Sequence, residues 1–187
     1  MLTGEAIPLL VLGLGNVLCG DDGVGTAAVT LLNRRYEIPD GVQVLDGGTL
    51  GLSLLPYIED AQQVILIDAV RSDDPAGSFV RLEGDAVAPA VANRLSPHQI
   101  GVADLLEGAR LRARYPRRVV LHGLVPETLE LRLGRSPAVE RSLPQLVERV
   151  AAEAARLGYA FSLKANDADD DVAAYRGAGD FARIFGL

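Results

Sequence analysis

The stretch Val11-Leu-Gly-Leu-Gly-Asn-Val-Leu-Cys-Gly-Asp-Asp-Gly-Val-Gly25 decides the fold. The apolar run from Ile7 to Leu14 predicts a short buried strand, which leads into a glycine-rich turn, and a helix is predicted to begin near Val24. A nucleotide-binding turn has the same order, but there the backbone N–H groups at the helix N-terminus attract an anion. The carboxylates of Asp21 and Asp22 would repel a phosphate. The turn therefore favours a cation or a polarised group.

The composition indicates one globular domain. The chain has 187 residues, of which 49% are hydrophobic, and this suits a sheet that is covered on both faces. A formal net charge of −7 argues against a nucleic-acid partner, because phosphates require a basic surface. Cys19 is the only cysteine, which excludes an intramolecular disulfide and suits a reducing compartment. No apolar run approaches the ~20 residues of a membrane helix, so we expect a cytoplasmic protein without membrane contact.

Strand and helix signals alternate along the chain. Strands are predicted at 7–14, 42–45, 64–67 and 119–125, and helices at 24–36, 51–59, 97–112 (with Ser96 as its N-cap) and 137–157. Residues 78–83 alternate in polarity as an antiparallel edge strand does, and a short strand is expected at 129–133. The predicted fold class is α/β, a three-layer α/β/α sandwich around a mostly parallel twisted sheet of about five strands.

The chain divides by composition into two parts. Residues 1–162 are predicted to form the single α/β domain, and residues 163–187 an acidic C-terminal extension that we expect to be flexible. A short amphipathic segment that docks on a protein is the alternative for this tail. Five arginines between 110 and 118 predict a solvated helix end, with a docking patch for an acidic partner as the other interpretation.

Polar side chains follow three of the predicted strands. Asn16, Asp21 and Asp22 follow the first strand, Asp46 ends the second and Asp68 ends the third. In open parallel sheets, sites form beyond the carboxyl ends of the strands, so these groups are predicted to converge. Each also has a plainer interpretation: Asp46 would shape a turn, Asp68 would cap the following loop, and the Asp pair would be N-cap and first-turn residues that favour the helix dipole.

The two histidines lie in different surroundings. His122 lies inside an apolar strand and is interpreted as a hydrogen-bonded core residue, whereas His98 lies in a turn that leads into a helix. Two carboxylates and one imidazole suit a divalent transition metal, because imidazole binds zinc, nickel, copper and iron. The ligand spacing is long-range, so no local motif specifies which groups would bind.

Five blocks in order carry a family resemblance. They are Gly13-Leu-Gly-Asn-Val-Leu-Cys-Gly-Asp-Asp-Gly-Val-Gly25, Asp46-Gly-Gly-Thr-Leu-Gly51, Leu66-Ile-Asp-Ala69, Ser96-Pro-His-Gln99 and Gly123-Leu-Val-Pro-Glu127. Over about residues 7–160 the chain resembles the hydrogenase maturation endopeptidases. The resemblance implies a cytoplasmic protease whose partner is the precursor large subunit of a nickel–iron hydrogenase. It would remove a C-terminal extension once nickel is in place.

The resemblance also implies roles for individual residues. Asp22, Asp68 and His98 match the metal-contacting positions, and the metal is nickel supplied by the substrate rather than a permanent cofactor. Asp46 matches a further functional carboxylate, so either Asp22 or Asp46 is the expected general base for an attacking water. We assign substrate contacts to four further residues of the same blocks: Asn16, Gly47, Gly48 and Thr49.

Two other functions stay open from the sequence. A nickel-sensing chaperone would bind the precursor without cutting it. A related α/β hydrolase is the other alternative, and the peptidyl-tRNA hydrolases share the Gly-Leu-Gly-Asn block. Those enzymes need an early catalytic histidine and a basic groove, whereas the first histidine here is His98 and the domain is acidic.

Overall fold

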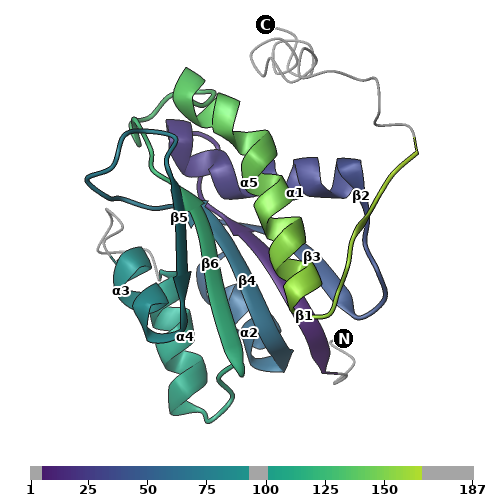
Figure 1. The fold of residues 1–187 in the computed structure, drawn as a ribbon. Helices are drawn as coiled ribbons and strands as arrows, with labels where there is room; N and C mark the ends of the chain where they lie inside the picture. Colours follow the sequence, from purple (N-terminus) through teal and green to yellow (C-terminus); the bar gives the residue numbers. More distant parts are fainter. Residues whose placement is uncertain (1–5, 93–100, 166–187) are drawn as a thin grey trace, which may run out of the picture.

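The computed structural model describes residues 6–92 and 101–165, and these form one five-stranded sheet with helices on both faces (Figure 1). The strand order is β3 (Val42–Gly48), β1 (Ile7–Leu14), β4 (Ala61–Ala69), β6 (Arg118–Leu124), β5 (Phe79–Glu83). The first four strands are mutually parallel, and β5 pairs antiparallel with β6 at the edge. The predicted α/β/α sandwich with a mostly parallel sheet is confirmed.

The two helical layers follow from the alternation of side chains along the buried strands. Leu9 and Val11 of β1 face α1 (Val24–Arg35) and α5 (Pro137–Arg156). Leu10 and Leu12 face the opposite layer of α2 (Leu55–Asp60), α3 (Val87–Ala92) and α4 (Val102–Leu111). Because successive strand residues point to opposite faces, a strand covered on both sides must be apolar throughout. Figure 1 shows α5 and α1 on one face of the sheet and α2 to α4 on the other.

Short elements connect these layers. The 3-10 turns are η1 (Gly20–Gly23), η2 (Gly51–Leu54) and η3 (Gly84–Ala86). A two-stranded sheet joins β2 (Tyr36–Glu37) to β7 (Ser162–Leu163), antiparallel. The N–H of Lys164 donates to the carbonyl of Arg35 at 2.9 Å, so the chain after α5 packs against the end of α1. Residues 166–187, which include most of the predicted extension, lie outside the described residues.

Three local predictions are wrong at least in part. The helix predicted for 97–112 begins at Val102, because Gly101 is extended (φ −83°, ψ 171°) and acts as the N-cap, its N–H donating to Asp104 Oδ2 at 2.9 Å. The predicted Ser96 cap lies outside the described residues. The strand expected at 129–133 is a single bridge between Arg132 and Cys19. Neither Asp21 nor Asp22 makes a side-chain cap bond at the start of η1 or α1, although both lie in the first turn of η1, as the helix-dipole interpretation expects.

Candidate active site

The loop after β1 is folded back tightly on itself. Gly15 has φ +118°, and a Cβ on it would lie 1.7 Å from the carbonyl oxygen of Asp22. Only glycine therefore fits this position. The N–H of Asn16 donates to Asp22 Oδ2 at 2.7 Å, and Asn16 Oδ1 accepts from the N–H of Leu18 at 3.0 Å. The carboxylate of Asp22 is thus held in one orientation beside the end of β1.

Asp21 has a different role from its neighbour. Its fully buried carboxylate accepts three backbone N–H bonds, from Glu127 (2.8 Å), Thr128 (3.2 Å) and Ser136 (2.6 Å). A buried carboxylate is tolerated only when its oxygens are satisfied in this way. Asp21 therefore fixes the loop after β6 against η1. The sequence gives no sign of this role, because the donors lie more than 100 residues away.

Asp46 lies at the carboxyl end of β3, level with Gly13 of β1 in the parallel register. Its Oδ1 accepts from Thr26 Oγ1 at 3.0 Å and from the N–H of Gly48 at 3.1 Å. The predicted turn-shaping role is confirmed by the bond to Gly48. Asp46 is also exposed, so the same carboxylate is accessible to an incoming group. Thr26, in the first turn of α1, is a site residue that the sequence did not reveal.

Asp68 ends β4 and is fully buried. In the register with β6 it lies opposite Gly123, and its Oδ1 accepts from the N–H of Ala69 at 2.8 Å. Ala69 is the last residue of β4, so this bond lies within the strand, and capping of the following loop by Asp68 stays a prediction. Since β1, β3 and β4 are parallel neighbours, Asp68 lies with Asp22 and Asp46 where the strands have their carboxyl ends. We call this end of the sheet its carboxyl edge.

A close approach of α1 to the sheet brings these groups to one edge. A Cβ on Gly25 would lie 2.3 Å from the carbonyl oxygens of both Leu14 and Ile67. A glycine at this position lets the first turn of α1 rest directly on the ends of β1 and β4. The loop after β1 is also joined to β3, because the N–H of Gly15 donates to the carbonyl of Gly48 at 3.0 Å.

The residues assigned to substrate contact lie in these same two loops. Asn16 is half-buried in the loop after β1. Gly47 is buried at the end of β3, Gly48 is half-buried there, and Thr49 follows them on the surface. Gly48 has φ +43° and lies where the register of β1 with β3 shifts. The two loops are joined by the bond between Gly15 and Gly48, but the contact of these four residues with a substrate stays a prediction.

The predicted metal set is only partly visible. His98 lies outside the described residues, and its grouping with Asp22 and Asp68 stays a prediction. Within residues 6–92 and 101–165, no three His, Cys, Asp or Glu side chains are grouped so that they could hold a metal ion. The described part of the chain does bring two of the three predicted ligands to one sheet edge.

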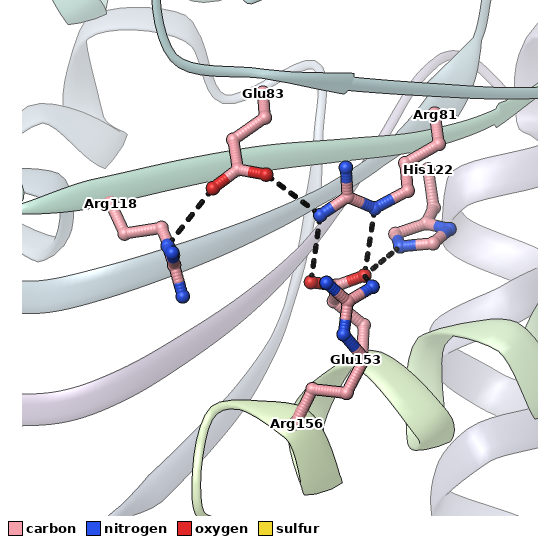
Figure 2. A network of polar contacts seen from close by, with 6 residues as sticks. All are labelled: Arg81, Glu83, Arg118, His122, Glu153 and Arg156. Atoms are coloured by element: carbon pink, nitrogen blue, oxygen red, sulfur yellow. Dashed lines mark hydrogen bonds and ion pairs between the residues drawn. The ribbon is translucent and has the colours of Figure 1, made fainter.

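The other histidine belongs to a separate polar network (Figure 2). His122 Nε2 lies 3.1 Å from Glu153 Oε2, and Arg81 contacts both oxygens of Glu153, with Nε at 2.9 Å and Nη2 at 3.0 Å. Arg81 also pairs with Glu83, which pairs with Arg118. The interpretation of His122 as a hydrogen-bonded core residue is confirmed.

This network changes the protonation of its members. The guanidinium of Arg81 is the main cause that lowers the pKa of Glu153 to about 2. Burial lowers the pKa of His122 below its usual 6.5, and the bond to Glu153 opposes that shift without cancelling it. His122 is therefore neutral at pH 7, and the network ties β5, β6 and α5 together.

The arginine-rich stretch from 110 to 118 is largely paired within the chain. The ion pairs are Arg110 with Asp85 (3.0 Å), Arg112 with Glu59 (3.1 Å), Arg114 with Asp60 (2.7 Å) and Arg118 with Glu83 (3.0 Å). These pairs favour a role within the fold over docking of an acidic partner.

Comparison with known proteins places this architecture in a class. The solved structure of the hydrogenase maturating endopeptidase HybD from Escherichia coli superposes with a TM-score of 0.79 at 35% identity, covering 84% of this chain and 98% of that one. The Hydrogenase 2 maturation protease of Escherichia coli (strain K12) is 39% identical over 145 residues, 77% of this chain and 88% of that protein. The hydrogenase expression/formation protein HoxM of Azotobacter vinelandii is 39% identical over 160 residues, 80% and 77%.

The chain has the fold of an endopeptidase with carboxylates at the carboxyl edge of its parallel sheet. The family model for hydrogenase maturation proteases matches residues 26–153. The chain belongs to the hydrogenase maturation protease family and is a peptide-bond hydrolase. None of the helices in the described ranges is long and apolar enough to span a membrane.

Proposed function

We propose that this chain is a cytoplasmic endopeptidase that removes the C-terminal extension from the nickel-loaded large-subunit precursor of a nickel–iron hydrogenase. The observation that carries the proposal is the gathering of Asp22, Asp46 and Asp68 at one sheet edge, in a chain of this family. Hydrolysis of a peptide bond needs an attacking water and a group that accepts its proton. Carboxylates at this edge supply that group.

Asp46 and Asp22 have different roles in the proposal. Asp46 is exposed and held by Thr26, so it can accept a proton from a water above the ends of the strands. Asp22 is half-buried and oriented by the N–H of Asn16 beside the end of β1, which suits a metal contact or a base. In the proposal Asp22, Asp68 and His98 contact the nickel that the precursor brings. The precursor can therefore engage these three residues of the protease only after its nickel has been inserted.

The nickel acts here as part of the substrate. A divalent metal polarises a carbonyl oxygen or lowers the pKa of a bound water, and carboxylate and imidazole ligands suit nickel. Because the ion comes with the precursor, cleavage waits for nickel insertion. A permanently bound metal is not required by this account.

The test is cleavage of purified precursor, followed by intact-mass measurement. The protein should release the C-terminal peptide from nickel-loaded precursor and leave nickel-free precursor whole. His98→Ala should lose this cleavage, whereas the matched control His122→Gln should keep it, because His122 lies in the separate network of Figure 2.

Three outcomes would contradict the proposal. Binding of the precursor without a released peptide would indicate a chaperone instead of a protease. Normal cleavage by His98→Ala would remove His98 from the site. A tightly bound stoichiometric zinc in the purified protein would indicate a conventional metalloprotease.

A further inference from the structure

Large apolar side chains are exposed around the proposed site. Among the described residues eight large hydrophobic side chains are exposed, and six of them lie in the loops that follow β1, β3 and β6. These six, which we call the apolar rim, are Val17, Leu18, Leu50, Leu52, Leu131 and Leu133, between 45% and 83% exposed. The other two, Leu111 and Leu163, lie at the end of α4 and in β7. The exposure of large hydrophobic groups is thus concentrated at one edge of the sheet.

The loops of the rim are fastened to one another. Arg132 donates its N–H to the carbonyl of Leu18 at 2.9 Å and accepts from the N–H of Gly20 at 3.0 Å. Leu131 and Leu133, on either side of Arg132, are therefore fixed beside Val17 and Leu18. The buried carboxylate of Asp21 also anchors this segment, because it accepts backbone N–H bonds from residues before Leu131 and after Leu133.

The third loop of the rim is held by the ends of the strands. The N–H of Gly15 donates to the carbonyl of Gly48, and the N–H of Leu50 donates to that of Gly47, at 3.0 and 2.9 Å. Leu50 thus follows directly on the turn that Asp46 shapes. The rim is a preorganised surface, so binding to it requires little ordering of the backbone.

The position of the rim determines what it meets. Asp22 lies between Val17 and α1, and Asp46 lies four residues before Leu50. The valine and leucine side chains of the rim are therefore carried by the same loops as these carboxylates. Monomeric proteins rarely gather exposed apolar groups in one place without a binding role.

We propose that the apolar rim binds an apolar stretch of the precursor next to the bond that is cut. This inference rests on the proposed function, since it takes the precursor as the partner. Affinity for the folded precursor then comes from the rim, and chemistry comes from the carboxylates held by the same loops. A surface of this kind raises kcat/KM through substrate binding, not through the chemical step.

The test compares two double variants. The rim variant carries Leu131→Ser and Leu133→Ser, and the matched control carries Leu111→Ser and Leu163→Ser. All four leucines are exposed, so neither variant should lose its fold, and thermal melts check this. We expect the rim variant to raise KM for nickel-loaded precursor about tenfold or more, with kcat changed less than about threefold. The control should match the parent protein.

Direct binding separates this inference from the proposed function. The Kd for intact precursor is measured with Asp22→Asn added to the parent, rim and control proteins. We expect the rim variant to weaken Kd by the same tenfold or more, whether or not cleavage occurs. Absence of cleavage by the parent protein would contradict the proposed function and leave this comparison valid. Equal Kd values for all three proteins, including no measurable binding by any, would overturn the inference.

Discussion

Two polar regions of the molecule hold their carboxylates in opposite ways. In the network of Figure 2, Glu153 is buried and contacts Arg81, His122 and Arg156, so that its charge is balanced by guanidinium groups. At the carboxyl edge of the sheet, Asp21, Asp22, Asp46 and Asp68 each accept backbone N–H bonds. Those bonds orient each carboxylate.

We infer that the network around Glu153 has a structural role and that the carboxylates at the strand ends have a chemical one. A carboxylate matched by arginine holds elements together, here β5, β6 and α5. A carboxylate oriented by backbone N–H groups at a strand end keeps its direction toward whatever enters the edge. Changes in the first region should therefore alter stability, and changes in the second should alter cleavage.

The largest effect is expected from Asp22→Asn. An asparagine oxygen can still accept the N–H of Asn16, so the loop should keep its shape. The lost carboxylate charge removes a nickel contact or a general base, and the cleavage rate should fall about 100-fold or more. Asp40→Asn, at an exposed turn before β3, is the matched control and should cleave normally. Equal rates for the two variants would remove Asp22 from the chemistry.

Asp21→Asn should lower stability at the same edge. The asparagine amide would point its own N–H groups at one of the backbone donors of Glu127, Thr128 or Ser136. Burying such unpaired donors costs about 3 kcal/mol, which lowers Tm by roughly 6–12 °C in a protein of this size. Thermal unfolding followed by circular dichroism measures this. An unchanged Tm would show that Asp21 does not fix the loop.

Glu153→Gln tests the structural role of the network in Figure 2. Glutamine fills the same space but loses the ionic contacts with Arg81, so unfolding should cost about 2 kcal/mol less. Urea unfolding measures the change. The turnover of precursor by the folded variant should stay near that of the parent protein. A large loss of turnover at full folding would link the network to catalysis.

The smallest effect is expected from pH. Because the pKa of His122 in the folded protein lies below 6.5, the unfolded chain binds a proton on this histidine more readily. The free energy of unfolding is therefore at its full value above pH 6.5 and decreases as the pH falls below that value. Glu153, with a folded pKa of about 2 and an ordinary value of 4.5, adds a second loss only between those values. Urea unfolding at pH 7.5 and 5.5 should show a small decrease, absent in His122→Gln. An equal decrease in that variant would exclude His122 as its source.

The sequence predicted the sheet because its signals are local. Apolar runs such as Val64–Ile67 mark strands covered on both faces, and the alternation of residues 78–83 marks the antiparallel edge. The surroundings of His122 could be read in the same way, from the apolar strand that contains it. Local pattern also placed Asp46 and Asp68 at strand ends.

What the sequence did not show depends on distant partners. The role of Asp21 depends on three N–H groups that are 106, 107 and 115 residues away. The pairing of β2 with β7 involves only two residues on each side, too few for a periodic signal. The strand expected at 129–133 is reduced to one bridge, because backbone pairing to the loop after β1 replaces a regular ladder.

The most direct test of the account measures cleavage and stability together in two variants. Asp22→Asn and Glu153→Gln are incubated with nickel-loaded precursor well below their melting temperatures, and the released C-terminal peptide is quantified by mass spectrometry beside a thermal melt. We expect Asp22→Asn to lose cleavage and keep its Tm, and Glu153→Gln to keep cleavage and melt at a lower temperature. Cleavage by Asp22→Asn at the parent rate would contradict it.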